Sequence, residues 1–151
     1  MQLKTTTDYA IRVLVCLAAQ KGKIVPSGVI AESMGIPRKY LTHIGMVLKS
    51  DDFIESYPGA YGGYRLLKDA EEIRLLDVVS LLEGTVRLNR CLENDCYCSR
   101  GAAPDCPVRK CYEVMQQKWE SFLRGITIAD ILAGIEKEEV EKRIDGAAHQ
   151  K

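Results

Sequence analysis

Five of the six cysteines of this 151-residue chain lie within 21 residues, between Cys91 and Cys111. The stretch from Glu93 to Asp105 is rich in Asn, Asp, Ser, Gly and Pro, a composition typical of a loop. Core cysteines are usually spread through regular helices and strands, and these are not. Because thiolates are preferred ligands of iron–sulfur clusters and zinc, the segment predicts a loop that binds an inorganic group. It contains no CxxC pair, which argues against a zinc ribbon or a thioredoxin-like motif.

The composition fits a small globular protein. Hydrophobic residues make up 46% of the chain, enough for a core within one compact domain or a small domain with an added dimerisation element. No apolar run reaches transmembrane length, and the charged residues of the first helix argue against a signal peptide. We therefore expect a soluble cytoplasmic protein with no membrane partner. In that compartment clustered cysteines hold metal more often than they form disulfides.

The N-terminal third predicts a helix-turn-helix. An amphipathic helix is expected over residues 5–20, with Cys16 as a small core residue. A second helix should begin at an N-cap, Ser27, and end at Gly35. A third should have proline in its first position and span residues 37–48. Two short helices joined by a glycine-containing turn are the signature of a helix-turn-helix.

A β-hairpin is expected directly after these helices. Residues 53–57 and 64–67 have the composition of strands, and the turn between them is rich in proline and glycine. A hairpin in this position forms a wing. Gly62 and Gly63 have no side chain, so the tip could approach a phosphate backbone closely. The same pair also suits an ordinary hairpin turn that needs positive φ.

The first half of the chain is mildly basic, although the formal net charge of the whole is zero. Residues 1–66 carry eight Lys and Arg against five Asp and Glu, which is compatible with binding to DNA. Polar side chains of the third helix could contact base edges or phosphates in a major groove, although they also suit a solvated helix face. The predicted DNA-binding residues are Ser27, Arg38, Lys39, Tyr40, His43, Gly62, Gly63 and Tyr64.

The second half predicts a buried helix over 73–82, the cysteine loop and a long amphipathic helix from Pro107 to Gly125. The apolar stripe of the long helix, on which Cys111 is read as a packing residue, suits a partner subunit. A short helix should follow at 128–132. The predicted fold is mainly α with a small β-wing: a winged helix-turn-helix domain (1–84), a cysteine-rich cluster-binding loop (85–106), a dimerisation helix with a short terminal helix (107–132) and a charged flexible tail (133–151).

Five groups of residues occur in a fixed order along the chain. They are Thr7–Arg12, Gly62–Leu66, Leu75–Val79 with Glu83 and Gly84, the spacing Cys91…Cys98…Cys106–Arg109, and Ile126–Leu132. This order closely resembles the Rrf-two family of bacterial winged-helix regulators, over residues 1 to about 132. The resemblance implies a homodimer that binds a palindromic double-stranded DNA operator. It also implies that the long helix pairs the subunits and that three cysteines hold an iron–sulfur cluster.

The ligands implied by the resemblance are Cys91, Cys98 and Cys106, with Cys96 competing for the middle place. IscR-like members use a His shortly after the third cysteine, where this chain has Arg109. NsrR-like members offer an Asp from the first helix of the other subunit. Asp8 matches that residue, but it also suits a helix-start carboxylate. Cys96 or Cys111 could also complete a set of four thiolates, and the cluster type stays open between 4Fe–4S and 2Fe–2S.

The leading hypothesis is a transcriptional regulator whose operator affinity is controlled by the cluster, which would sense redox state, nitric oxide or cluster supply. In the alternative, the same DNA-binding dimer uses its cysteines as a thiol redox switch or holds structural zinc. A more remote alternative is an electron carrier. The sequence has no P-loop or dinucleotide fingerprint and no evident nucleophile–base pair, so an enzyme is not expected.

Overall fold

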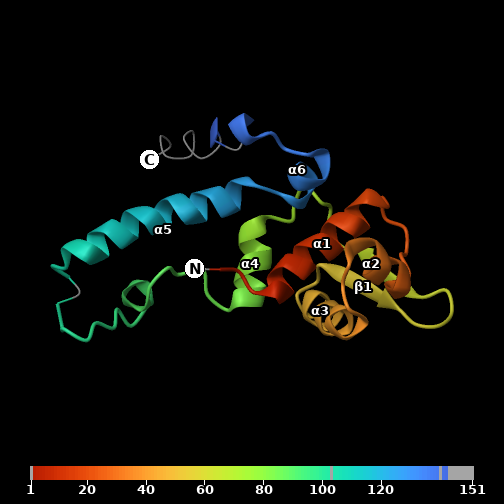
Figure 1. Cartoon of the computed structure of the whole chain (residues 1–151), viewed down its shortest axis with the longest axis horizontal. Coiled ribbons are helices and arrows are strands. Elements are labelled where there is room, and N and C mark those ends of the chain that lie inside the picture. The colour runs from red at the N-terminus through yellow and green to blue at the C-terminus, as the bar shows by residue number, and fades with distance from the viewer. Residues whose placement is uncertain (1, 103, 140, 143–151) are drawn as a thin grey trace.

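The computed structural model describes residues 2–102, 104–139 and 141–142, and Figure 1 shows an elongated molecule with a compact helical domain at one end. In chain order the elements are α1 (Thr5–Ala19), α2 (Ser27–Met34), α3 (Arg38–Ser50), β1 (Ile54–Tyr57), β2 (Gly63–Leu66), α4 (Leu75–Glu83), the 3-10 helix η1 (Arg90–Leu92), α5 (Pro107–Gly125) and α6 (Ile128–Ala133). Residues 137–139 and 141–142 are also helical. The rest of the predicted tail, residues 140 and 143–151, lies outside the described residues.

Helix α1 is the centre of the compact domain. It contacts α2, α3, α4, α6 and β2, and its buried residues recur at the spacing of one helix face. Cys16 belongs to this face and is buried, as the sequence predicts. The largest side chains around α1 are fully or almost fully buried, and they come from every part of the domain: Phe53, Leu41, Ile44, Leu48, Ile73 and Ile128. Together they form a single core.

The sequence places the helices and strands correctly to within a residue or two. Gly35 and Gly84 end α2 and α4 in the left-handed conformation, with φ of 63° and 79°. Two helix starts are wrong by one residue, because the N-caps are Pro26 and Pro37, both with extended ψ. Ser27 is therefore the first residue of α2 and not its N-cap.

The two strands form an antiparallel wing that is attached to the domain. Ile54 pairs with Leu66, and Tyr57 pairs with Gly63. The wing continues into a bridge with Val25, whose N–H donates to the carbonyl of Tyr64 at 2.8 Å and whose carbonyl accepts from Tyr64 N–H at 2.9 Å. The hairpin is therefore held against the connection between α1 and α2.

The C-terminal segment leaves the domain and returns to it. In Figure 1, α5 projects away from the helical domain, with the cysteine loop running beside it, and α6 packs back on α1. Thr127 caps α6 in a capping box with Asp130, and a bridge between Thr127 and Arg74 fixes the return. Ile128 then enters the core of the helical domain. Within the described residues, no helix is long and apolar enough to cross a membrane.

Glu83 joins the end of α4 to the start of α1. Its Oε1 accepts hydrogen bonds from the hydroxyl of the fully buried Thr7 at 2.5 Å and from Lys4 N–H at 2.8 Å, and Lys4 Nζ lies 3.6 Å from Oε2. Desolvation by burial alone would raise the pKa of Glu83. The hydrogen bonds from Thr7 and Lys4, with the charge of Lys4, outweigh this effect and lower the pKa.

We expect Glu83→Gln to destabilise the protein by about 1–2 kcal/mol at neutral pH, because a charge-assisted hydrogen bond and an ion pair are lost together. The lowered pKa of Glu83 means that this stabilisation is present above the ordinary carboxyl pKa and is lost as pH falls through the folded-state value. Urea unfolding of wild type and variant as a function of pH checks this. The two free energies should converge in acid, whereas the exposed Glu72→Gln control should match wild type throughout.

Candidate functional site

Three cysteines of the loop line one pocket of about 260 Å³. They are Cys91 in η1, Cys98 in the loop and Cys106, the N-cap of α5. The residues implied as ligands by the family resemblance are therefore brought together around one space, although the first and the last are 15 positions apart in the sequence. The other lining residues are Asn89, Arg90, Tyr97, Ser99, Val108, Arg109 and Tyr112.

Cys98 lies in a turn whose backbone N–H groups favour its thiolate. Hydrogen bonds from the backbone of Ala102 and then Arg100 lower the pKa of Cys98, and the charge of Arg100 adds to this effect. A ring of backbone donors of this kind acts as an anion-binding site. Cys106 stands at the N-terminus of α5, where the helix dipole also favours a negative ligand. The pKa of the Cys98 thiol is thus lowered by backbone donors, and Cys106 stands at the N-terminal end of a helix.

The remaining loop cysteines lie outside this lining. Cys96 is exposed, has a left-handed backbone with φ of 47°, and its Sγ accepts a hydrogen bond from Arg109 Nη2 at 3.5 Å. Cys111, which the sequence suggests as a packing residue of α5, is also exposed in the single chain. The pocket therefore distinguishes Cys98 from Cys96, a choice that spacing left open.

The donor set fits a polynuclear group. Three thiols around one pocket can each bind a different iron of a cluster, whereas the ligands of one tetrahedral zinc all lie roughly 2.3 Å from a single ion. Among the residues that the structure describes, no three Cys, His, Asp or Glu side chains are close enough to hold one metal ion. The pocket also contains Arg109, whose buried Nε has no hydrogen-bond partner. An anionic group fits such a donor.

Asp8 lies on the exposed face of α1 and does not line the cysteine pocket of its own chain. Its carboxylate forms an ion pair with Arg12 at 2.7 Å. The Arg12 guanidinium lies 5.7 Å from the ring centre of Tyr9, and Tyr9 meets Tyr40 of α3 edge to face at 5.8 Å. A continuous line of side chains thus joins Asp8 to the first turn of α3.

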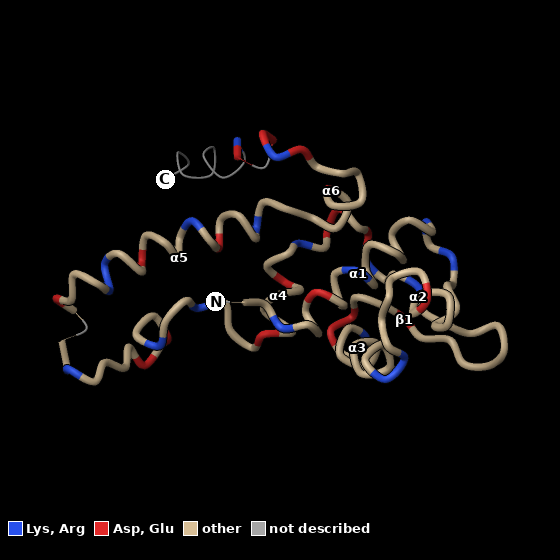
Figure 2. The backbone as a smooth tube through the Cα atoms, in the orientation of Figure 1, with Lys and Arg blue, Asp and Glu red and all other residues tan. Residues whose placement is uncertain are grey.

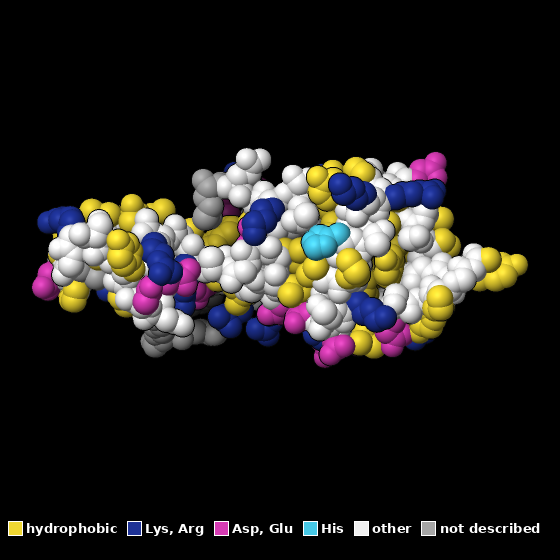
Figure 3. Space-filling view, turned by 90° about the horizontal axis from the view of Figure 1, so that it is seen from below, with side chains coloured by type: hydrophobic (Ala, Val, Ile, Leu, Met, Phe, Trp, Pro, Cys, Tyr) yellow, Lys and Arg dark blue, Asp and Glu magenta, His cyan; other side chains and the backbone are white. Residues whose placement is uncertain are grey.

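The predicted DNA-binding residues of α2 and α3 are all exposed: Ser27, Arg38, Lys39, Tyr40 and His43. The guanidinium of Arg38 lies against Gly28 of α2, since a Cβ added to Gly28 would be 3.6 Å from Arg38 Nη2. The starts of the two helices therefore adjoin. In Figure 3 a histidine lies among Lys and Arg side chains on the face seen from below, and Figure 2, which views α3 nearly end-on, shows Lys and Arg on this helix.

The wing glycines have an internal role that the sequence did not reveal. A Cβ on Gly63 would overlap the carbonyl oxygen of Val25, and one on Gly62 would overlap the carbonyl oxygen of Tyr57. Tyr64 is only partly exposed, and its hydroxyl packs over Gly45 of α3, where a Cβ would collide with the ring. Gly63 and Tyr64 therefore hold the wing against the domain, whereas Gly62 allows the close approach of the chain within the hairpin itself.

Tyr61 is the residue of the wing that the prediction missed. It is 96% exposed at the hairpin tip, and the tip projecting at the right of Figure 3 is hydrophobic. In the sequence Tyr61 lies at the tip of the hairpin, between Gly59 and Gly62, where the short strands offer nothing to cover its ring. This position could have identified Tyr61 as an exposed residue of the wing.

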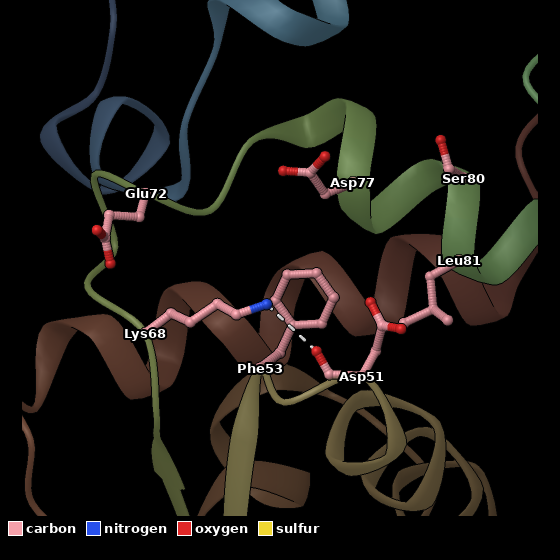
Figure 4. Close-up of a pocket in the computed structure, with 7 residues that line it drawn as sticks. All are labelled: Asp51, Phe53, Lys68, Glu72, Asp77, Ser80 and Leu81. Carbon is pink, nitrogen blue, oxygen red and sulfur yellow. Dashed lines mark hydrogen bonds between the residues drawn. The ribbon is translucent and has the colours of Figure 1, made fainter.

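A second, open pocket of about 490 Å³ lies between the α3–β1 connection, the segment that follows β2 and α4 (Figure 4). Lys68 crosses it, with Nζ 4.4 Å from the ring centre of Phe53 and 3.3 Å from the carbonyl oxygen of Asp51. Asp77 points toward the same space, whereas Glu72 lies at its edge with its carboxylate turned away (Figure 4). These contacts attach the segment after β2 to the core, and no predicted site residue takes part in them.

Comparisons with known proteins identify the family of the chain. Residues 3–134 match the Rrf2 family model, described as an iron-dependent transcriptional regulator. The protein rrf2 of Nitratidesulfovibrio vulgaris is 34% identical over 134 residues, which cover 87% of each chain. Among solved structures, T. potens IscR is 25% identical with a TM-score of 0.69, covering 92% of this chain and 91% of that one.

CymR, the global cysteine regulator of B. subtilis, has the same fold, with a TM-score of 0.68 at 21% identity over 90% of this chain and 99% of that one. These winged-helix relatives are transcriptional regulators and not enzymes, and the predicted mainly helical fold with a β-wing is confirmed. The match to the family model and the identity to a named relative show that the chain belongs to the Rrf2 family of transcriptional regulators.

Proposed function

We propose that this protein is a homodimeric regulator whose affinity for a palindromic DNA operator is controlled by an iron–sulfur cluster bound at Cys91, Cys98 and Cys106. The single observation that carries the proposal is the pocket at the start of α5, which is lined by these three thiols and by Arg109, whose Nε is buried. Because it acts on chromosomal DNA, such a regulator works in the cytoplasm.

DNA recognition is assigned to α3 and the wing. In a winged helix-turn-helix the second short helix enters the major groove, which admits one α-helix and presents a distinct pattern for each base pair. Arg38, Lys39 and His43 supply donors on that helix, and Tyr40 adds a hydroxyl and an aromatic face. Ser27 and the wing tip contact the phosphate backbone on either side, with the exposed Tyr61 at the tip.

Dimerisation is assigned to α5. Its Val108, Val114 and Met115 are half exposed, and Trp119 stacks on Phe122 at 6.1 Å along the same helix. Helical faces with this much exposed apolar surface usually meet a partner. A second copy with two-fold symmetry would place two α3 helices on half-sites that lie about 34–36 Å apart on B-DNA, or a multiple of that spacing. The domain boundaries predicted from the sequence follow this division of roles.

The three cysteines and a fourth ligand would each bind the cluster in a different environment. When bound, the cluster supplies a centre that responds reversibly to electrons and destructively to oxidants or nitric oxide. Cys98 and Cys106 bind it as thiolates held by backbone donors and by the α5 dipole. Three thiolates accommodate either 4Fe–4S or 2Fe–2S with a fourth ligand, which we assign to Asp8 of the partner subunit. Cys96 is the alternative fourth ligand.

The line of contacts from Asp8 supports a route from the cluster to DNA. An Asp8 carboxylate that binds iron leaves Arg12, to which it is otherwise paired at 2.7 Å. Arg12 rests on Tyr9, which packs against Tyr40 at the start of α3. A change of partner at Asp8 would therefore shift the first turn of α3, and small shifts of two recognition helices alter operator affinity.

The experiment that tests the proposal is anaerobic purification followed by a gel shift on the region upstream of the protein's own gene. Holo protein should be brown and contain iron and acid-labile sulfide, and its operator affinity should differ from that of the apo protein. Oxygen-protected protein that contains neither iron nor sulfide, yet binds the operator fully, would overturn cluster control while leaving the DNA-binding dimer in place.

A thiol redox switch is the second candidate function. The observation that favours it is the lowered pKa of Cys98, because thiolate is the form that reacts with oxidants. The same anaerobic preparation distinguishes the thiol switch from the iron–sulfur cluster. A colourless protein whose operator affinity changes with peroxide and recovers with dithiothreitol supports the switch, and a colourless protein that contains zinc supports a structural ion.

We expect Arg38→Ala to weaken operator binding by roughly 1–3 kcal/mol, about 5–150-fold, because a basic side chain at the start of a recognition helix contacts bases or phosphates. Fluorescence anisotropy at several salt concentrations measures the change and shows whether the salt slope falls by about one, as loss of a phosphate contact requires. Lys118→Ala on α5 removes the same charge from an exposed site outside α3 and should retain wild-type affinity. Wild-type affinity in Arg38→Ala would exclude this residue from the interface.

A further inference from the structure

Arg109 has a donor without an acceptor. Its Nε is the only buried side-chain nitrogen or oxygen among the described residues that lacks a hydrogen-bond partner. Buried polar groups in folded proteins are nearly always paired, so an unpaired one needs an explanation such as a bound group. Arg109 lies in the first turn of α5, three residues after Cys106, and its side chain is 20% exposed.

The rest of the guanidinium is held in place. Glu113 Oε1 lies 3.1 Å from Nε and forms an ion pair with it, but the Nε–H does not point at this oxygen with hydrogen-bond geometry. On the other side, Nη2 donates to Cys96 Sγ at 3.5 Å. These two contacts hold the guanidinium beside the cysteine pocket.

The pocket supplies a reason for that free donor. Arg109 lines the same space as Cys91, Cys98 and Cys106. A guanidinium stays protonated and has no lone pair to give, so it cannot act as a metal ligand in the way that a His at this position could. It can donate to the sulfur atoms of a bound cluster, and hydrogen bonds to cluster sulfur are among the factors that set its reduction potential.

We propose that Arg109 is a positioning residue for the bound cluster: its Nε–H donates a hydrogen bond to a cluster or ligand sulfur, and its charge offsets the negative charge of the three thiolates. This inference rests on the proposed function. It assigns to Arg109 a role in retaining the cluster and in raising its reduction potential, in place of the fourth-ligand role of a histidine. Glu113 and Cys96 orient the guanidinium for this contact.

The test compares Arg109→Met, Arg109→Lys and Lys110→Gln in the full-length, anaerobically reconstituted dimer. Methionine keeps much of the side-chain length but removes charge and donor, whereas lysine keeps the charge and loses the Nε–H. Lys110→Gln is the matched control, since it removes one positive charge from the exposed neighbouring position. The readouts are the midpoint potential in a dithionite titration and the rate of iron loss to a chelator, with circular dichroism as the check on folding.

We expect Arg109→Met to disfavour the reduced cluster tenfold, which lowers the midpoint potential by about 59 mV for one electron. It should also release iron about tenfold faster, as expected when a group next to a ligand is lost. Arg109→Lys should show a smaller shift in the same direction, because the charge remains. Lys110→Gln should match wild type in both readouts.

The outcomes separate this inference from the function on which it rests. Arg109→Met with the potential and release rate of Lys110→Gln would overturn the role of Arg109 and leave the cluster proposal intact. Wild-type protein that takes up no iron or sulfide would overturn both. If Arg109→Met fails to fold or to retain a cluster, the midpoint potential and iron-release rate of Arg109→Lys test the inference. Wild-type values of both quantities in Arg109→Lys would refute it.

Discussion

We expect Cys98→Ser to lose the proposed cluster and Cys96→Ser, two residues earlier, to keep it. Cys98 lines the pocket with Cys91 and Cys106 and has backbone donors that favour its thiolate, whereas Cys96 is exposed outside the lining. Loss of groups next to a metal ligand already costs about 10–100-fold in affinity, so loss of a ligand itself should exceed ~100-fold. Iron and acid-labile sulfide per protomer after anaerobic reconstitution measure the difference.

Two further variants complete this experiment. Cys111→Ser should behave as Cys96→Ser, because Cys111 is also exposed and does not line the pocket. Asp8→Ala should fold as wild type and lose its cluster to a chelator faster, since the carboxylate is assigned to the partner's cluster. Equal cluster content in Cys98→Ser and Cys96→Ser would mean that the pocket is not the binding site. Loss of cluster in Cys96→Ser alone would make that residue the middle ligand.

Gly63→Ala is the second variant for which we expect a large effect. A Cβ on Gly63 would overlap the Val25 carbonyl oxygen and lie 2.8 Å from the Cα of Pro26, and both obstacles are backbone atoms. The hairpin would have to move away from the α1–α2 connection. That movement breaks the two hydrogen bonds between Val25 and Tyr64, at 2.8 and 2.9 Å.

We expect this variant to lose roughly 3 kcal/mol of stability, from two backbone hydrogen bonds at about 1 kcal/mol each and the strain of overpacking. Urea unfolding of apo protein at fixed concentration measures it. Gly125→Ala is the matched control, because a Cβ there meets nothing within 4 Å and alanine favours the helix. Its stability should equal or slightly exceed that of wild type. A Gly63→Ala protein within about 0.5 kcal/mol of wild type would show that the wing tolerates displacement.

Gly63→Ala should also separate structure from DNA contact. If the wing glycines serve only to approach phosphate, the variant should fold normally and bind the operator weakly. If their packing against Val25 dominates, stability and operator affinity should fall together, because a displaced wing cannot keep its place beside α3.

The local structure of this protein was readable from short stretches of sequence. The apolar spacing of α1 and α5, the glycines that end α2 and α4, and the loop composition around the cysteines each depend on residues a few positions apart. Such features follow from backbone conformation and helix periodicity, which the neighbouring residues determine. The order of five motifs was likewise enough to predict the family that the comparisons established.

The sites depended on contacts between distant segments, and these only the tertiary structure decided. Spacing could not choose between Cys96 and Cys98, because an irregular loop has no period that tells which side chain faces inward; the fold placed Cys98 in the pocket. Gln116 looks like a surface residue of α5, yet it is 4% exposed and bonds to the backbone of Val86 and Leu88.

The internal role of Gly63 and the bond between Thr7 and Glu83 have the same origin. A hydrogen bond that joins residues 76 positions apart, or a glycine needed because a remote carbonyl comes close, leaves no local signal. Sequence determines such contacts only through the way the whole chain packs. That is why the class of protein could be predicted, while the atoms that surround its cysteine pocket and support its wing could not.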